Sequence, residues 1–74
     1  MKQEFMDLRG LKCPQPIIKL GARAPSMTKG DVIEAVADCH TFENDVRKWC
    51  ERLGKTLLWV KMEDEKTFRV QIQL

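Results

Sequence analysis

The chain has 74 residues, which is enough for one small domain and leaves no room for a second. With 43% hydrophobic and 32% charged residues, the composition excludes collagen-like and disordered chains. The net charge of +2 is far below the basic excess of most duplex-binding domains, so we expect no direct binding to nucleic acid. A domain this small buries about 60% of its unfolded surface, so its site should be shallow.

The start of the chain carries charges where a secretory signal would need an apolar stretch. The longest apolar run, residues 57–60, is far shorter than the roughly 20 residues of a membrane-spanning helix. We therefore expect one cytoplasmic domain over residues 1–74. Three cysteines is an odd count, so at least one thiol should be free, and we do not expect the disulfide framework of small secreted proteins.

The first half of the chain predicts a strand, a helix and a second strand. Residues 3–8 are typical of a short strand, ended by Arg9-Gly10. From Pro14, apolar residues recur at helical spacing as far as Ala24, which predicts a first helix of about three turns that begins immediately after Cys13. Residues 32–37 are mostly apolar and β-branched, as expected of a central strand.

The second half predicts another helix and a closing hairpin. Asp38 or Thr41 can cap the helix, and Gly54 can close it. Its predicted apolar face consists of Phe42, Val46, Trp49, Cys50 and Leu53. Residues 56–62 and 67–74 then form two strands around an acidic turn at 63–66.

This order, β-α-β-α-β-β, predicts an α/β (α+β) two-layer sandwich with two helices on one face of a mixed four-stranded sheet. The other sheet face should be polar, because two helices cover only one side. Alternation would put Trp59 on that open face, where an exposed tryptophan would indicate a partner surface.

Cys13 is the strongest candidate for chemistry. A cysteine at the N-cap of a helix meets unpaired backbone N–H groups and the positive end of the helix dipole, and both favour the thiolate. Arg9 and Lys12 would add to this effect if their side chains turn toward the sulfur. Pro14 and Pro16 stiffen the turn, so that the sulfur is presented in one place. These features favour nucleophilic sulfur exchange over the alternative of a buried, inert cysteine.

The segment Leu8-x-Gly10-Leu11-x-Cys13-Pro14-x-Pro16, followed by an apolar helix, resembles the signature of the TusA/SirA-like sulfur-carrier family, also called YedF/YeeD-like. The resemblance covers nearly the whole chain. It implies that Cys13 accepts a sulfane sulfur as a persulfide and passes it to a partner protein, with Gly10, Pro14, Gln15 and Pro16 shaping the site. It implies no cofactor.

Family members take part in tRNA thiolation, molybdenum-cofactor synthesis and sulfur oxidation, and some act beside a membrane transporter of thiosulfate. The resemblance therefore implies a sulfur donor that is a cysteine desulfurase, a rhodanese-like protein or thiosulfate itself, and an acceptor protein of a sulfur relay. A domain that a partner must reload is a carrier, whereas direct attack of Cys13 on thiosulfate would make it a transferase.

The sequence departs from the family pattern at two places. Gln15 stands where well-known members often have Glu, and Asp38 is followed by Cys39-His40, where many have Asp-Pro or Asp-Asp. Because the end of a second strand often shares a sheet edge with the start of a first helix, Cys39 is expected near Cys13. Cys39 would then resolve or accept a sulfur from Cys13, or it would only fill a helix N-terminus.

Other patterns have simpler explanations. Adjacent Cys39-His40 lacks the ligand spacing of structural zinc sites, so no metal is expected. Cys50 lies on the apolar stripe of its helix and is predicted to be core. The basic residues near Cys13 would dock an acidic partner or an anion such as thiosulfate, or would only be solvated, and they are Arg9, Lys12, Lys19 and Arg23.

Two rival functions stay open at this point. In the first, Cys13 is a redox sensor that is oxidised and then resolved by Cys39 in a regulatory interaction module. The second is an RNA-binding module, because the element order resembles the C-terminal domain of a translation initiation factor. The modest charge and the lack of an aromatic sheet motif count against RNA binding.

Overall fold

The computed structural model of the protein describes residues 2–74. In chain order its elements are β1 (Gln3–Asp7), α1 (Gln15–Arg23), the 3-10 helix η1 (Ala24–Ser26), β2 (Val32–Ala37), α2 (Phe42–Leu53), β3 (Thr56–Met62) and β4 (Phe68–Gln73). This order confirms the prediction from the sequence. Helix α1 ends at Arg23, two residues before Pro25. The chain then continues for one turn as the 3-10 helix η1.

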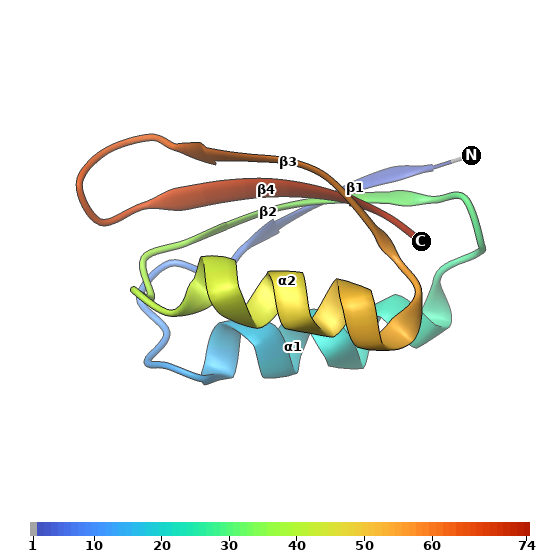
Figure 1. Ribbon diagram of the computed structural model, residues 1–74, viewed down its shortest axis with the longest axis horizontal. Helices are drawn as coiled ribbons and strands as arrows, with labels where there is room; N and C mark the ends of the chain where they lie inside the picture. The colour runs from blue at the N-terminus through green and yellow to red at the C-terminus, as the bar shows by residue number, and fades with distance from the viewer. Residues whose placement is uncertain (1) are drawn as a thin grey trace.

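The four strands form one mixed sheet in the order β1-β2-β4-β3. The pair β1 and β2 is parallel, and β4 runs antiparallel to both of its neighbours. Both helices lie on the same side of this sheet (Figure 1). The structure is therefore the predicted two-layer sandwich, with the predicted central strand β2 in an inner position.

The core lies between the helices and the sheet. Its largest fully buried side chains come from both helices and from strands β2 and β4, and include Leu20, Ile33, Phe42, Val46, Val70 and Ile72. One predicted core residue is wrong, because Leu53 is 50% exposed. As the last residue of α2, Leu53 borders a surface hollow with Gly21 and Pro25 instead of packing against the sheet.

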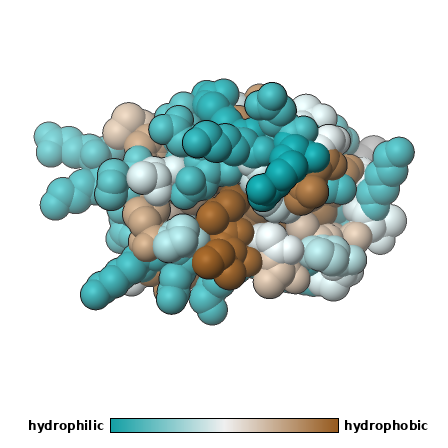
Figure 2. Space-filling view, turned by 60° about the horizontal axis from the view of Figure 1, so that its bottom comes forward, coloured by the Kyte–Doolittle hydropathy of each residue, from teal (hydrophilic) through white to brown (hydrophobic). Residues whose placement is uncertain are grey.

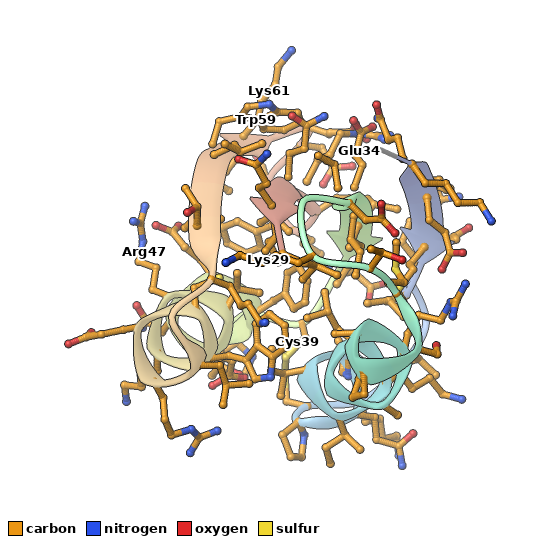
Figure 3. The ribbon with its side chains drawn as sticks, turned by 90° about the vertical axis from the view of Figure 1, so that its right-hand side faces the viewer. Lys29, Glu34, Cys39, Arg47, Trp59 and Lys61 are labelled. Atoms are coloured by element: carbon orange, nitrogen blue, oxygen red, sulfur yellow. A yellow bond between two sulfur atoms is a disulfide. The ribbon has the colours of Figure 1, made fainter. Side chains whose placement is uncertain are left out.

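The opposite sheet face is open, and Trp59 lies on it with Glu34 and Lys61 (Figure 3). Trp59 is 37% exposed, and its indole N–H donates to Gln71 Oε1 at 3.2 Å, which confirms the predicted placement. A register irregularity in β3 between Leu57 and Trp59 leaves Leu58 exposed as well.

The connections give the molecule two different ends. The carboxyl ends of β1 and β2 and the first turns of α1 and α2 gather at the left of Figure 1, whereas the chain ends lie at the right. At that right-hand end the carboxylate of Asp31 accepts the N–H of Lys2, and the Asp31 carbonyl accepts the N–H of Leu74. Across residues 2–74, the structure holds no helix with the length and apolar character to span a membrane.

Candidate functional site

Two loops bring Cys13 and Cys39 together at the end of the molecule that lies at the left of Figure 1. Cys13 lies between β1 and α1, and Cys39 lies between β2 and α2. Because β1 and β2 are parallel, their carboxyl ends share one sheet edge, and the loops that follow them are neighbours. The two cysteines are joined by a disulfide with their Cα atoms 5.5 Å apart, which confirms the predicted proximity.

The two sulfurs have different surroundings. Cys13 is exposed, whereas Cys39 is only 4% exposed and packs into the core between the helices and the sheet (Figure 3). A reagent or partner protein from solution therefore meets Cys13 first.

The disulfide accounts for two of the three cysteines. Cys50 carries the free thiol that the odd count required, and it is buried on α2 as predicted. Burial raises the pKa of the Cys50 thiol, which keeps it protonated and unreactive. We expected no disulfide framework of the kind found in small secreted proteins. Over the described residues, the structure contains a single disulfide, Cys13–Cys39. The bond joins the two loops of the candidate site.

Gly10 and Asp38 fix the two loops to each other. Gly10 has a φ of +83°, a conformation that glycine adopts without strain. Its backbone N–H donates to both carboxylate oxygens of Asp38, each at 3.1 Å. Asp38 directly precedes Cys39, and Gly10 lies three residues before Cys13, so this contact joins the two cysteine loops.

The helix after Cys13 begins later than predicted. Pro14, not Cys13, is the N-cap residue of α1, and Gln15 is its first residue. Pro14 and Pro16 have no backbone N–H, and the Gln15 N–H donates to the Lys12 carbonyl at 2.7 Å. The first turn therefore offers fewer free N–H groups to the sulfur than an ordinary helix start, because prolines occupy two of its positions.

The predicted basic residues do not all face Cys13. The Arg9 guanidinium donates to both carboxylate oxygens of Asp7, at 2.9 and 2.8 Å. These hydrogen bonds lower the pKa of Asp7 to about 2 and raise the pKa of Arg9. Arg23 is likewise paired with Glu4 on β1. Lys12, next to Cys13 in the loop, and Lys19, in the middle of α1, are both exposed.

His40, which the sequence analysis considered only as a metal ligand, lies beside Cys13 in the structure. Its Nδ1 lies 3.9 Å from the Sγ atom of Cys13, and its side chain is exposed. The signal that points to it is its position directly after Cys39, a residue already expected near Cys13. An imidazole here can donate a proton to an anionic sulfur or hold it by charge.

Behind Cys39 lies a short hydrogen-bonded chain. The hydroxyl of Thr41 is 3.2 Å from the Cys39 Sγ atom and donates to Asp45 Oδ2 at 3.0 Å. A hydroxyl has one hydrogen to donate, and the carboxylate takes it. In the disulfide the Cys39 sulfur carries no hydrogen, whereas a thiol at this position would have one to donate to the Thr41 oxygen, with Asp45 as the acceptor at the end of the chain.

Within residues 2–74, no three His, Cys, Asp or Glu side chains stand close enough to hold a metal ion. A surface hollow of about 710 Å³, lined by Gly30, Lys55 and Leu74 among others, lies at the opposite end from Cys13.

Comparison with known proteins connects this site to a family. The family model described as "Sulfurtransferase TusA" matches residues 4–74. A protein of Aquifex aeolicus named "Putative sulfur carrier protein" is 36% identical over 62 residues, which are 84% of this chain and 32% of that protein. The chain thus spans about a third of that relative. "Sulfur carrier protein TusA" of Pseudomonas putida is 32% identical over 86% of this chain and 79% of its own length.

A solved structure shows the same fold. The SirA-like protein of Desulfitobacterium hafniense superposes with a TM-score of 0.78 and 24% sequence identity, covering 95% of each chain. The family match extends from β1 through β4 and includes both cysteine loops. On this evidence the chain belongs to the TusA sulfurtransferase family.

Proposed function

We propose that this protein is a sulfur carrier that holds a sulfane sulfur as a persulfide on Cys13 and passes it to a partner protein. The observation that carries the proposal is the exposed position of Cys13, between β1 and α1, in a chain of the TusA family. The relatives from Aquifex and Pseudomonas bear the name of sulfur carrier proteins. A reduced thiol at Cys13 requires a reducing compartment, which for such a carrier is the cytoplasm.

Loading is a displacement at sulfur by the Cys13 thiolate. With a persulfide donor such as a cysteine desulfurase or a rhodanese-like protein, the Cys13 Sγ atom bonds to the outer sulfur and the donor thiolate leaves. With thiosulfate, the same bond forms and sulfite leaves. His40, 3.9 Å from Cys13 Sγ, is placed to hold the anionic sulfur in either case.

The surface around Cys13 suits a protein partner. Ile18 on α1 is 60% exposed, one helical turn from the start of the helix. Figure 2 shows apolar side chains gathered in the middle of the helix-bearing face and bordered by hydrophilic ones. The exposed lysines Lys12 and Lys19 favour an acidic partner beside this apolar contact.

A redox-sensing module is the second candidate, and the Cys13–Cys39 disulfide favours it. In the oxidised protein the Cys13 sulfur is bonded and accepts no sulfane sulfur, so only the reduced protein acts as a carrier. A sensor would form and lose this bond without ever carrying sulfur. The two candidates therefore differ in whether reduced Cys13 gains a sulfur atom.

The test uses the reduced Cys39→Ser variant, in which Cys13 has no disulfide partner. After incubation with thiosulfate, or with a cysteine desulfurase and cysteine, intact-protein mass spectrometry should show a gain of about 32 Da per sulfur that a reductant removes. The matched control is the double variant Cys13→Ser, Cys39→Ser, which retains Cys50 and should gain nothing. Absence of the adduct with both donors, while Cys13 is readily alkylated, would leave the redox module as the better reading.

A further inference from the structure

We propose that Cys39 is a resolving thiol that discharges the Cys13 persulfide as hydrosulfide, so that the protein reduces sulfane sulfur as well as carrying it. This inference rests on the proposed persulfide at Cys13. The structure supports it by joining the two sulfurs in a disulfide between loops that Gly10 and Asp38 hold together. The reaction would leave the protein in this oxidised state.

The step balances without an outside oxidant. The Cys39 sulfur attacks the Sγ atom of the persulfide Cys13–S–S⁻, the Sγ–Sγ bond forms, and the bond from Cys13 to the outer sulfur breaks. The Cys39 thiol proton passes toward Thr41 and Asp45, and the outer sulfur takes a proton from His40 and leaves as HS⁻, so that one proton is lost and one is gained in the step. The two cysteine sulfurs together lose two electrons, and the sulfane sulfur gains them. A cellular thiol reductant then restores the dithiol.

The burial of the two residues favours attack at the inner sulfur. In thiol–disulfide exchange the attacking and leaving sulfurs stand on opposite sides of the sulfur under attack. Cys39 approaches from the core, where it is 4% exposed, and Cys13 is exposed on its other side. The outer sulfur of the persulfide therefore points to solvent, in line to leave. Transfer of that sulfur onto Cys39 would instead require room for it in the core.

The neighbours of both cysteines supply the proton transfers. Reduced Cys39 donates to the Thr41 hydroxyl, which in turn donates to Asp45, so the chain of hydrogen bonds accepts the thiol proton as Cys39 attacks. His40 lies beside Cys13 on the solvent side and can deliver a proton to the departing sulfur. In this step Cys39 is the catalytic residue, and Thr41 positions and deprotonates it.

The experiment compares reduced wild-type protein with the Cys39→Ser variant, each freed of reductant. Both receive thiosulfate, or a desulfurase preloaded with one sulfur equivalent and freed of cysteine. Released sulfide is measured together with intact mass and with the number of alkylatable thiols. We expect about one sulfide per wild-type chain, with loss of the Cys13 and Cys39 thiols, and a stable adduct of about 32 Da without sulfide from Cys39→Ser.

The outcomes separate this inference from the proposed function. A stable adduct on both proteins, with no sulfide and no disulfide, would overturn the inference and leave the carrier function intact. No adduct on Cys39→Ser and no sulfide from the wild-type protein would overturn both. Cys50→Ser is the matched control for loss of a cysteine outside the site, and it should release sulfide as the wild-type protein does.

A second variant tests the reaction without removing a sulfur. Thr41→Val keeps the shape of the side chain and removes the hydroxyl, so we expect sulfide release to slow by about tenfold or more. The loss should be larger in sulfide release than in persulfide formation, and Thr41→Ser, which keeps the hydroxyl, should restore the rate. An unchanged rate in Thr41→Val would remove the hydroxyl from the mechanism. If Cys39→Ser also loads and discharges normally, the whole inference fails.

Discussion

Gly10 shapes the site through its backbone conformation rather than through lack of space. An added Cβ atom would meet no other heavy atom within 4 Å, yet the φ of +83° is one that other residues adopt only with strain. We therefore expect Gly10→Ala to lower the free energy of unfolding by about 1–2 kcal/mol, measured by urea denaturation. It should also slow formation of the Cys13–Cys39 disulfide, because the Gly10 N–H holds Asp38.

Gly21 provides the matched control for this substitution. It lies inside α1, and a Cβ atom there would be 3.4 Å from the indole nitrogen of Trp49, an ordinary contact distance. Alanine is favoured over glycine inside a helix by about 1 kcal/mol, so Gly21→Ala should not reduce stability. Equal losses in the two variants would show that strain at Gly10 is not the cause.

The two faces of α1 differ in burial: one packs into the core and the other is exposed to solvent. Leu20 is fully buried in the core, whereas Ile18 is 60% exposed beside the cysteine loop. We expect Leu20→Ala to lower the free energy of unfolding by about 2–5 kcal/mol through the cavity it leaves. Ile18→Ala should leave stability unchanged and slow the transfer of sulfur between Cys13 and its protein donor, followed by timed mass spectrometry. Equal rates for Ile18→Ala and wild type would remove Ile18 from the contact surface.

Asp31 connects the start of β2 to the start of β1. Its carboxylate accepts the backbone N–H groups of Thr28 at 2.9 Å and Lys2 at 3.0 Å, and these hydrogen bonds lower its pKa. A lowered folded-state pKa stabilises the protein above the unfolded value of about 3.9, and the contribution is lost as the pH falls through the folded value.

Asp31→Asn should therefore be less stable than the wild-type protein at neutral pH, and the difference should shrink as the pH falls below the unfolded value of about 3.9 and through the lowered folded value. Urea denaturation of both proteins across this range measures the difference. The comparison isolates Asp31, because the other carboxylates with lowered pKa, such as Asp7 and Asp64, are present in both. A difference that does not change with pH would assign the effect to packing.

The elements were predictable because their signals are local. The period-two alternation of Val70 and Ile72 and the helical spacing of Val46 and Trp49 both report a buried face directly. The prediction that Leu53 is a core residue was wrong, because helical spacing alone does not indicate where the sheet beneath a helix ends. The predicted start of α1 was one residue too early, because the chain forms a turn from Lys12 to Gln15 before the helix begins.

At the scale of the whole molecule, the Cys13–Cys39 disulfide crosses from one β-α connection to the other with a sequence separation of 26. Closing a loop of this length in the unfolded chain contributes about 3 kcal/mol of stability in the chain-entropy model. Reduction should lower the free energy of unfolding by roughly that amount, measured by guanidinium denaturation with and without reductant. Cys39→Ser should match the reduced protein and show no response to reductant, and a response there would point to another redox site.

The site was predictable in outline and not in its contacts. The motif around Cys13 and the parallel pair β1 and β2 sufficed to place Cys39 nearby, because strand direction decides which loops meet. The pairing of Arg9 with Asp7 and the approach of His40 depend on which way each side chain turns from its loop. A sequence pattern shows which residues are neighbours along the chain, whereas these contacts depend on side-chain rotamers and on the geometry of the turns.

The two ends of the molecule differ in a way that matters for anyone who labels it. Lys2 and Leu74 meet at Asp31, at the end of the sheet away from both cysteine loops (Figure 1). A fluorescent protein or affinity tag fused next to Lys2 or Leu74 therefore lies at the end of the molecule opposite to Cys13 and leaves Cys13 open. Tagged protein can be used to capture a sulfur donor or acceptor as a mixed disulfide without the tag covering the contact.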